Sequence, residues 1–488
     1  MSFELEEVSA GQALVPPFRL NFVRPRRPFK PVRRSAEPQF HNAQAPGPRS
    51  HGVYHMTRYV GIDLHKHLIV GHVLDAAGTK VDTFRYESVD AATLEHIGRN
   101  RLRPEDEVVL EATTNCWAVV RALEPFVARV AVSNPMATKA IAKAKVKTDK
   151  VDAAVLAHLL RLGYLPEVWQ PDLATRGLRE WTIRSSRIVG QRTTAINRLR
   201  STLAQRLLHC PYDMSSPVAR DWIAGQTVDE DTRWLLESDL RLMDSVQAEL
   251  DAMDQLLAQR GYVDPRVKLL MTLPGISQHS AQSLLAAIGD ITRFRDADSL
   301  ASYLGLVPST RQSANHCYHG PITKQGRSHT RWMLIQAAQS VRLHPGPLGH
   351  FFRRLKRRKP YNVAVVAVAH KLVLLAWHVL TKQEPYRYAL PQATENKLRR
   401  LRIQATGLKR PTGSAPGTKK SPAKLPGGSQ RIKPLAEVYA NEQVPAACPA
   451  PAGELRRLDE LELTDFADSL QHEHIVPRRR RNSAASSG

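Results

Sequence analysis

Short apolar runs that end in carboxylates constrain the fold most strongly between residues 57 and 165. One run ends at Asp63 and a second ends at Glu111, so each acid lies at the exit of an expected strand. Further along, Asp149 and Asp152 are three residues apart, which places both on one face of a helix. Gathered carboxylates repel one another unless cations hold them, and their hard oxygen atoms suit Mg²⁺ or Mn²⁺. We therefore predict that the four acids converge on a divalent-metal site.

Expected strands and helices alternate through this same segment and predict an α/β domain. The strands are expected at 58–63, 68–74, 80–86, 108–111 and 128–133, and the helices at 90–100, 116–126 and 138–162. Three strands followed by alternating helices and strands favour a mixed sheet covered by helices. Acids on the first strand, the fourth strand and a late helix follow the order expected of an RNase H-like (RuvC-like) nuclease core. Any one of these acids alone would more often be a solvated surface residue.

The charge of the chain points to a polyanionic partner. The 488 residues carry a formal net charge of +24, which favours nucleic acid over a basic surface without a partner. The four cysteines form no Cys-x-x-Cys pair, which argues against a zinc ribbon or a disulfide framework and favours a reducing cytoplasm. The most apolar run, 361–380, contains His370 and Lys371, so we expect a buried helix and no membrane span.

Composition divides the chain into five segments. They are a disordered Pro- and Arg-rich basic leader (1–55), the α/β domain (56–165), a helical arm (166–265), a mainly α-helical domain (266–385) and a disordered basic tail (386–488). Met56 stands directly before the first strand, and the sequence leaves open whether it is the native start or whether the leader is a basic extension that touches nucleic acid. The tail holds eleven Lys and Arg residues and no acid between 397 and 433. Such a polycation can contact phosphates without reading sequence, or can be a solvated tail without a role.

The two helical segments each contain a candidate nucleic-acid contact. Heptad-like apolar spacing in 166–265 favours an antiparallel helical pair, either a dimerising coiled coil or a bundle within one chain. Arginines interleave its first half, Arg198 among them. In the next segment, the Leu-Pro-Gly-Ile run around Gly275 resembles a helix–hairpin–helix turn, whose backbone N–H groups face a phosphate. A turn that serves packing alone is the alternative.

These motifs together resemble a known family. The chain resembles DEDD-type insertion-sequence transposases, the bridge-RNA-guided recombinases related to the Piv DNA invertase. The matching residues are Gly61-Ile-Asp63-Leu-His-Lys66, Glu111-Ala-Thr, Lys147-Thr-Asp149-Lys-Val-Asp152-Ala, Leu273-Pro-Gly275-Ile, Phe294, Tyr303-Leu-Gly305-Leu-Val-Pro308, Gln312-Ser313, Ile322-Thr-Lys324-Gln-Gly326 and Arg331. They extend across residues 58 to 385.

The resemblance implies a chemistry for the matched residues. It implies that the four acids hold Mg²⁺ and that Ser313, in the mainly helical domain, attacks the DNA backbone to form a covalent protein–DNA link. The family usually follows this serine with glycine, whereas this chain has Ala314, which resists positive φ. Ser309 is the competing hydroxyl. Lys324 and Arg331 are candidates to steady phosphate charge, although surface solvation is the simpler interpretation of either residue alone.

The resemblance also implies partners and a location. It implies a bacterial, nucleoid-associated enzyme that acts on the ends of its own insertion element and on target DNA. A structured noncoding RNA and assembly as a dimer or tetramer belong to the same expectation. Two alternatives remain. One is a RuvC-like junction-resolving endonuclease that uses water and leaves Ser313 structural. The other is a catalytically silent protein that binds RNA or DNA.

Overall fold

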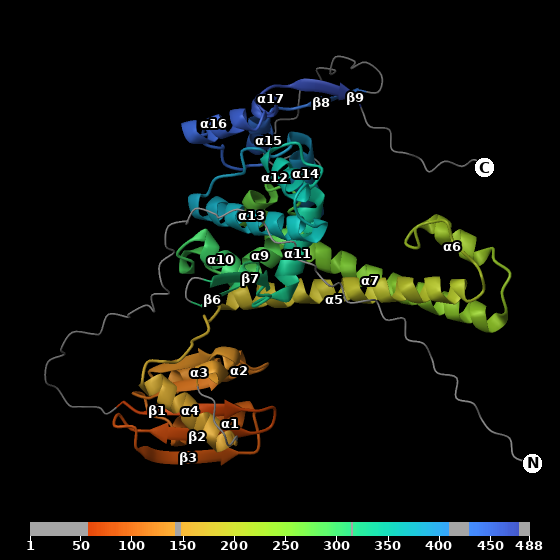
Figure 1. Cartoon of the computed structure of the whole chain (residues 1–488). Coiled ribbons are helices and arrows are strands. Elements are labelled where there is room, and N and C mark those ends of the chain that lie inside the picture. Colours follow the sequence, from red (N-terminus) through yellow and green to blue (C-terminus); the bar gives the residue numbers. More distant parts are fainter. Residues whose placement is uncertain (1–56, 142–147, 314–315, 409–428, 478–488) are drawn as a thin grey trace, which may run out of the picture. The chain divides into compact units, whose positions relative to one another are not determined.

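The computed structural model describes residues 57–141, 148–313, 316–408 and 429–477 (Figure 1). The chain divides into two compact units at Val168, and each is described by itself below. The predicted leader, Met56, Ala314 and the basic run 478–481 lie outside the described residues.

The first unit is built on a mixed five-stranded sheet, as the sequence predicts. The strands are β1 (Tyr59–Leu64), β2 (Ile69–Leu74), β3 (Lys80–Tyr86), β4 (Glu107–Glu111) and β5 (Arg129–Ser133). Their order in the sheet is β3-β2-β1-β4-β5. β1 to β3 pair antiparallel, whereas β4 runs parallel to both β1 and β5. The carboxyl ends of β1, β4 and β5 therefore lie at one edge of the sheet.

Helices cover both faces of this sheet. On one face, α1 (Ala91–Asn100) and α2 (Cys116–Leu123), which continues into η1 (Glu124–Phe126), pack on the apolar side chains of alternate strand positions. On the other face, α4 (Asp149–Arg161) packs Leu156 and Leu160 against Val109 and Ala131. Since strand side chains alternate between faces, the residues of β1 that face α4 are those on the side of Gly61.

The single long helix expected at 138–162 is wrong. The structure has α3 (Pro135–Ile141) and, separately, α4, which begins at Asp149. Thr148 has an extended backbone (φ −145°, ψ 153°), and its side chain accepts a hydrogen bond from the backbone N–H of Val151. A threonine that caps a helix in this way satisfies one of the free N–H groups of the first turn. The helix therefore starts at the two candidate acids and does not run through them.

In the second unit, α5 (Leu173–Ala204) and α7 (Glu230–Val263) form the helical arm, with α6 (Pro217–Ala224) between them (Figure 1). Midway along α5, Ile188 packs with Val246, Leu250 and Leu257 from the middle and second half of α7. Near the end of α5, its apolar residues pack with the first half of α7. The two helices are therefore antiparallel and bury apolar side chains against each other, so the predicted antiparallel helical pair is present in the structure.

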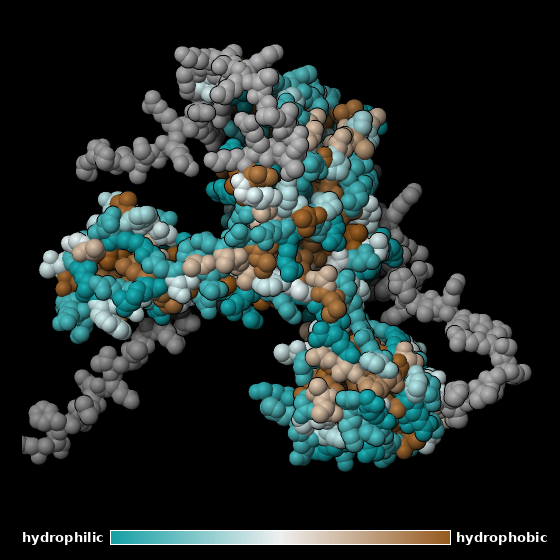
Figure 2. All heavy atoms as spheres, turned by 180° about the vertical axis from the view of Figure 1, so that it is seen from behind, coloured by the Kyte–Doolittle hydropathy of each residue, from teal (hydrophilic) through white to brown (hydrophobic). Residues whose placement is uncertain are grey.

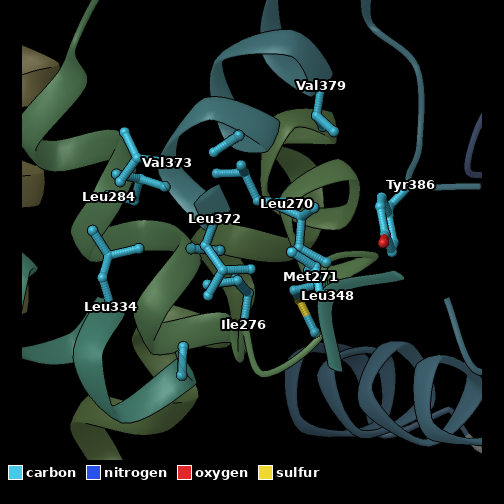
Figure 3. Close-up of a cluster of buried hydrophobic side chains, with 14 of the residues drawn as sticks. Leu270, Met271, Ile276, Leu284, Leu334, Leu348, Leu372, Val373, Val379 and Tyr386 are labelled. Carbon is cyan, nitrogen blue, oxygen red and sulfur yellow. The ribbon is translucent and has the colours of Figure 1, made fainter. Parts of the chain in front are cut away.

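The remaining helices surround a large apolar core. They are α8 (Pro265–Met271), α9 (Gln278–Ile288), η2 (Ile291–Arg293), α10 (Ala297–Tyr303), α11 (Ser328–Val341), α12 (Pro347–Lys356) and α13 (Tyr361–Lys382). Figure 3 shows Leu270, Leu284, Leu334 and Leu372 converging from four of them. Among the described residues, α13 alone is long and apolar enough to cross a membrane. Its buried side chains belong to this core, so the predicted buried helix is confirmed.

Between α10 and α11 the chain forms an antiparallel hairpin of β6 (Pro308–Ser313) and β7 (His316–Ile322). The sequence predicts a polar loop here, and the structure corrects this. Nearly every described residue of the hairpin is exposed. An exposed strand of this kind lacks the alternation of apolar and polar residues by which strands are recognised.

The predicted disordered tail is also wrong over its described parts, 386–408 and 429–477. These contain α14 (Pro391–Thr406), β8 (Ser429–Ile432), α15 (Leu435–Asn441), α16 (Ala452–Glu460), α17 (Thr464–Ser469) and β9 (His474–Pro477). Leu398, Leu401 and Tyr439 are buried in the same core as α13. α14 combines basic residues with a stripe of apolar side chains. Because the basic residues dominate its composition, the sequence predicted disorder here.

The outer surface agrees with the composition. In Figure 2 the visible face is mostly hydrophilic, with apolar side chains scattered in small groups. Isolated apolar residues of this kind are normal on a folded surface.

Candidate metal centre and hairpin serine

β1 and β4 bring two of the predicted acids to the same edge of the sheet. The strands are parallel, and Ile62 lies opposite Leu110, so the next residues, Asp63 and Glu111, follow side by side. Asp63 is two residues beyond Gly61, and Glu111 is two residues beyond Val109, which packs on α4. By the alternation of strand side chains, both carboxylates lie on the face that α4 covers.

Gly61 explains how closely α4 approaches this edge. A Cβ atom at Gly61 would lie 2.0 Å from the carbonyl oxygen of Ala153 and 2.7 Å from the backbone nitrogen of Ala157. The helix backbone therefore rests directly on β1. The first turn of α4 contains Asp149 and Asp152, so this contact holds both acids near the end of β1.

Three residues form a compact group of metal-ligating atoms. One such atom from each of Asp63, His65 and Asp149 lies within 4.8 Å of the other two. Nε2 of His65 is 3.2 Å from Oδ2 of Asp63 and 3.5 Å from Oδ1 of Asp149. Glu111 and Asp152 are not members of this group, although Asp152 is near enough to act on the charge of Asp63. The structure thus brings together two of the four predicted acids and adds a histidine.

The electrostatics of Asp63 fit a cation site. Burial raises the pKa of the Asp63 carboxyl; His65 opposes this effect, while Asp149 and Asp152 raise the pKa further. Its Oδ2 atom is buried and has no hydrogen-bond partner with good geometry among the described residues. The contact with Nε2 of His65 at 3.2 Å leaves this buried oxygen incompletely satisfied, and a bound cation would satisfy it. The two carboxylates are ligands that suit Mg²⁺ and Mn²⁺, whereas the imidazole is a ligand more typical of Zn²⁺ and other transition metals.

His65 is the member of the group that sequence reasoning missed as a ligand. It follows Asp63 by two residues, just past the end of β1 at Leu64. The spacing Asp-x-His at a strand exit puts two ligand side chains on one face, and this was the available signal. A lone histidine beside an apolar strand is not specific enough to be chosen without the structure.

Ser313 lies at the far end of the hairpin, in the second unit. It is the last residue of β6, it is exposed, and it pairs directly with His316 of β7. Ser309, the competing hydroxyl, lies at the other end of the strand, where the register shifts between Pro308 and Thr310. It is only partly exposed, and a Cβ atom at Gly320 would lie 2.4 Å from its Oγ. Of the two serines, Ser313 is the more accessible to a large substrate.

The structure gives Arg331 a different place from the predicted phosphate contact. Its side chain is buried, and Nη1 donates hydrogen bonds to the carbonyl oxygens of Leu304 (3.1 Å) and Gln325 (2.8 Å). These two oxygens belong to chain segments that touch closely, since a Cβ atom at Gly305 would lie 2.4 Å from the carbonyl oxygen of Gln325. Arg331 therefore joins the two segments and does not face solvent.

The other predicted nucleic-acid contacts have mixed surroundings. Lys324 is exposed and has a left-handed backbone (φ 55°). Arg198 pairs with Asp239 across the arm, with Nη2 and Oδ1 2.6 Å apart, and stays half exposed. Gly275 has φ +76°, and a Cβ atom there would lie 2.3 Å from the carbonyl oxygen of Ala337 in α11. The close packing against α11 is therefore a reason for glycine at this turn, whether or not the turn also faces a phosphate.

Two family models of transposases match this chain. A family model for DEDD transposases of the IS110 type matches residues 60–207, and one described as "Transposase IS116/IS110/IS902 family" matches residues 267–352. A DEDD transposase domain implies an RNase H-like fold, with which the mixed sheet of the first unit agrees.

Curated relatives extend this likeness. A putative transposase of Sinorhizobium fredii is 28% identical over 49% of this chain and 56% of its own length. A probable family 20 transposase of Pseudomonas aeruginosa is 28% identical over 30% of this chain and 44% of its own length. A pilin gene-inverting protein of Moraxella bovis is 27% identical over 53% of this chain and 74% of its own length. The chain spans about half the length of the first two relatives.

Both family models and these relatives make the chain similar to the IS110/IS116/IS902 family of transposases.

Proposed function

We propose that this protein is a transposase that moves its own insertion element by cutting and rejoining DNA through a covalent serine–DNA intermediate. The observation that carries the proposal is the group formed by Asp63, His65 and Asp149, in which the Asp63 carboxylate is largely buried. An exposed Ser313 at the end of a hairpin supports the nucleophile. A relative named for inverting a pilin gene supports DNA recombination as the outcome.

The first unit would supply the cation site. Asp63 and Asp149 would hold a divalent ion, for which Mg²⁺ is our proposal and Mn²⁺ the substitute, and Glu111 and Asp152 would complete the site around DNA. When bound, such an ion polarises a phosphoryl oxygen and neutralises charge that develops on it. The residues of the chain fix its position, because β1, β4 and α4 hold their acids at one sheet edge.

The second unit would supply the nucleophile. The Oγ atom of Ser313 attacks a backbone phosphorus, so that an Oγ–P bond forms and the bond from phosphorus to one deoxyribose oxygen breaks. The serine gives up its proton, and the released deoxyribose oxygen takes one from solvent. Because one phosphoester replaces another, the free hydroxyl of a second strand can reverse the step and exchange strands without an energy-rich cofactor.

The basic chain would bind its nucleic acids through phosphates. With a net charge of +24, it is suited to hold element ends and target DNA, and we extend the proposal to an element-encoded guide RNA. We also propose that it works as a dimer or tetramer, in the bacterial cytoplasm at the nucleoid. Lys324 is an exposed cation beside the hairpin that fits a phosphate contact.

The test uses the full chain, a DNA fragment that carries the gene with its natural flanks, and RNA transcribed from those flanks. We expect Mg²⁺-dependent cleavage and a protein–DNA adduct that survives detergent, both lost with EDTA. Ser313→Ala should lose the adduct and strand exchange, whereas Ser309→Ala, the matched control, should keep both. An adduct that persists in Ser313→Ala would contradict the proposed nucleophile.

Two other functions give different results in the same assay. A junction-resolving endonuclease that uses water would still cleave after Ser313→Ala and would form no adduct. A silent nucleic-acid-binding protein would bind the DNA with no cleavage in Mg²⁺ or Mn²⁺. The grouping of Asp63, His65 and Asp149 favours a working cation site over this last alternative.

A further inference from the structure

We propose that His316 is a further catalytic residue, which takes the proton from the hydroxyl of Ser313 as the serine attacks DNA. The inference rests on the proposed function, since it needs Ser313 as the nucleophile. It goes beyond that function because it names the group that activates the serine, and this group lies within the hairpin itself.

The register of the hairpin places the two residues together. β6 and β7 are antiparallel, and Ser313 is the direct partner of His316. Directly paired residues have their Cβ atoms about 4.5–5.5 Å apart on the same face of the sheet. An imidazole ring can span this separation to reach a serine Oγ. Both residues are exposed, so the pair is open to a DNA strand.

The rest of this face suits a DNA backbone. Alternation puts Arg311 and Tyr318, which also pair directly, on the same face as Ser313 and His316. The rings of His316 and Tyr318 stack with centroids 6.5 Å apart and an angle of 25° between their planes. Tyr318 is 67% exposed. A guanidinium for phosphate and an aromatic ring for a base thus flank the serine and histidine.

The opposite face of the hairpin has a different arrangement. There, Thr310 pairs with His319, and the Oγ1 atom of Thr310 lies 3.1 Å from Nδ1 of His319 in a hydrogen bond. Nε2 of the same ring is 3.8 Å from the sulfur of Cys317. His319 is therefore a histidine of the same strand and exposure that points away from Ser313, and it serves as the matched control.

The chemistry balances without a further reactant. A neutral ring nitrogen of His316 accepts the proton of the Ser313 hydroxyl while the Oγ–P bond forms and the bond from phosphorus to the deoxyribose oxygen breaks. The released oxygen takes a proton from water. When a second strand's hydroxyl attacks the phosphoserine link, that hydroxyl gives its proton to solvent and the imidazolium returns its own proton to the serine Oγ. A histidine suits both directions, because it exchanges protons near neutral pH.

The experiment measures the rate of adduct formation by the full chain on the DNA and RNA described above. General-base catalysis contributes roughly 10²–10⁴-fold, so His316→Ala and His316→Gln should slow the adduct by about that factor. Added imidazole should restore part of the rate in His316→Ala and none in Ser313→Ala. A merely structural role would show no such rescue.

The His319→Ala variant is the control for His316→Ala. His319→Ala should form the adduct at the rate of the unchanged protein. If His316→Ala matches His319→Ala, or if imidazole gives no rescue of a slowed variant, the inference is overturned. If the adduct survives in Ser313→Ala, the proposed function itself fails. Unfolding curves should be unchanged in both histidine variants, because both side chains are exposed.

Discussion

The burial of Asp63 and the acids around it are what a metal-ligating carboxylate needs. Its carboxyl is only 14% exposed, and two other acids raise its pKa in addition to the effect of burial. A carboxyl whose folded pKa lies above its unfolded value binds more protons when folded, so stability falls as pH rises from the unfolded pKa through the folded one. Ionisation of Asp63 therefore lowers the stability of the chain, and a bound cation would offset this effect.

This leads to the first prediction. In the presence of EDTA at neutral pH, Asp63→Asn should unfold at the same or a higher temperature than the unchanged chain. Mg²⁺ at 100 times its dissociation constant should stabilise the unchanged chain by about 2.7 kcal/mol, and it should stabilise the variant by much less. Thermal unfolding with and without Mg²⁺ measures both effects. An equal response to Mg²⁺ in the two proteins would exclude Asp63 as a ligand.

Arg331 and Lys324 both match family motifs, but Arg331 is buried and Lys324 is exposed. Substitutions at the two positions should therefore have different effects on stability and DNA binding. Arg331→Met removes the donor to two carbonyl oxygens, at a cost of about 1–3 kcal/mol for a buried group left without a partner. We expect lower stability in urea unfolding and unchanged DNA affinity of the folded variant. Lys324→Asn, which tolerates the left-handed backbone, should show the reverse. Loss of DNA affinity in Arg331→Met without loss of stability would restore the phosphate role.

The sequence predicts some of the individual site residues and misses others. The type and spacing of Asp63 and Asp149 were enough to predict two members of the cation group. His65 was missed, and Arg331 was given a solvent-facing role, because burial and hydrogen-bond partners depend on distant segments. Arginine is seldom buried unless it has partners, and nothing near Arg331 in sequence reveals the carbonyl of Leu304.

At the scale of elements, the contact between α4 and β1 positions the acids, and Gly61 permits it. Gly61→Ala would place a Cβ atom 2.0 Å from the carbonyl oxygen of Ala153, so the helix must move away from the strand. We expect a loss of about 1–3 kcal/mol in unfolding free energy, as for other overpacked sites, and weaker Mg²⁺ binding because Asp149 moves with the helix. Calorimetric titration of Mg²⁺ and urea unfolding provide the measurements.

Gly190→Ala is the control for this change. Gly190 lies inside α5, and a Cβ atom there would meet no atom within 4 Å. Alanine stabilises a helix interior by about 1 kcal/mol over glycine, so this variant should be slightly more stable and should bind Mg²⁺ normally. If Gly61→Ala behaves like Gly190→Ala, then α4 does not hold the acids as described.

The elements also divide into those that sequence patterns predict and those that they do not. The strands of the first unit were placed within one or two residues, because their apolar runs are bounded by turn residues. The start of α4 was missed, since the threonine at its cap sits within a segment of uniformly helical composition. The hairpin was missed because both of its strands are exposed and polar, so burial leaves no period-2 pattern in them.

At the scale of the whole chain, the region after residue 385 contributes to the core of the second unit although its composition predicts disorder. High Lys and Arg content predicted disorder, yet α14 and α15 bury apolar side chains in the core of the second unit. The buried side chain of Arg402 meets the buried Glu442, with Nη2 and Oε1 2.9 Å apart. This pairing between positions 40 residues apart has no local signal. Tertiary pairing, which composition does not report, made this part of the fold unpredictable.

Truncation tests the corrected boundary. Removing all residues after 385 strips from the core Leu398, Leu401, Leu435, Tyr439 and Leu458. Each fully buried apolar side chain contributes about 1.5–3 kcal/mol, so the loss of all five is comparable to the ~5–15 kcal/mol by which a typical native protein is stable. We expect this truncated chain to aggregate or to lose the cooperative unfolding of its second unit, as followed by calorimetry. Removing only the residues after 477 should leave that transition unchanged. The chain truncated after residue 385 could instead unfold cooperatively at the same temperature as the full chain. In that case the helices after residue 385 contribute nothing to the core, and the tail is disordered as its composition predicts.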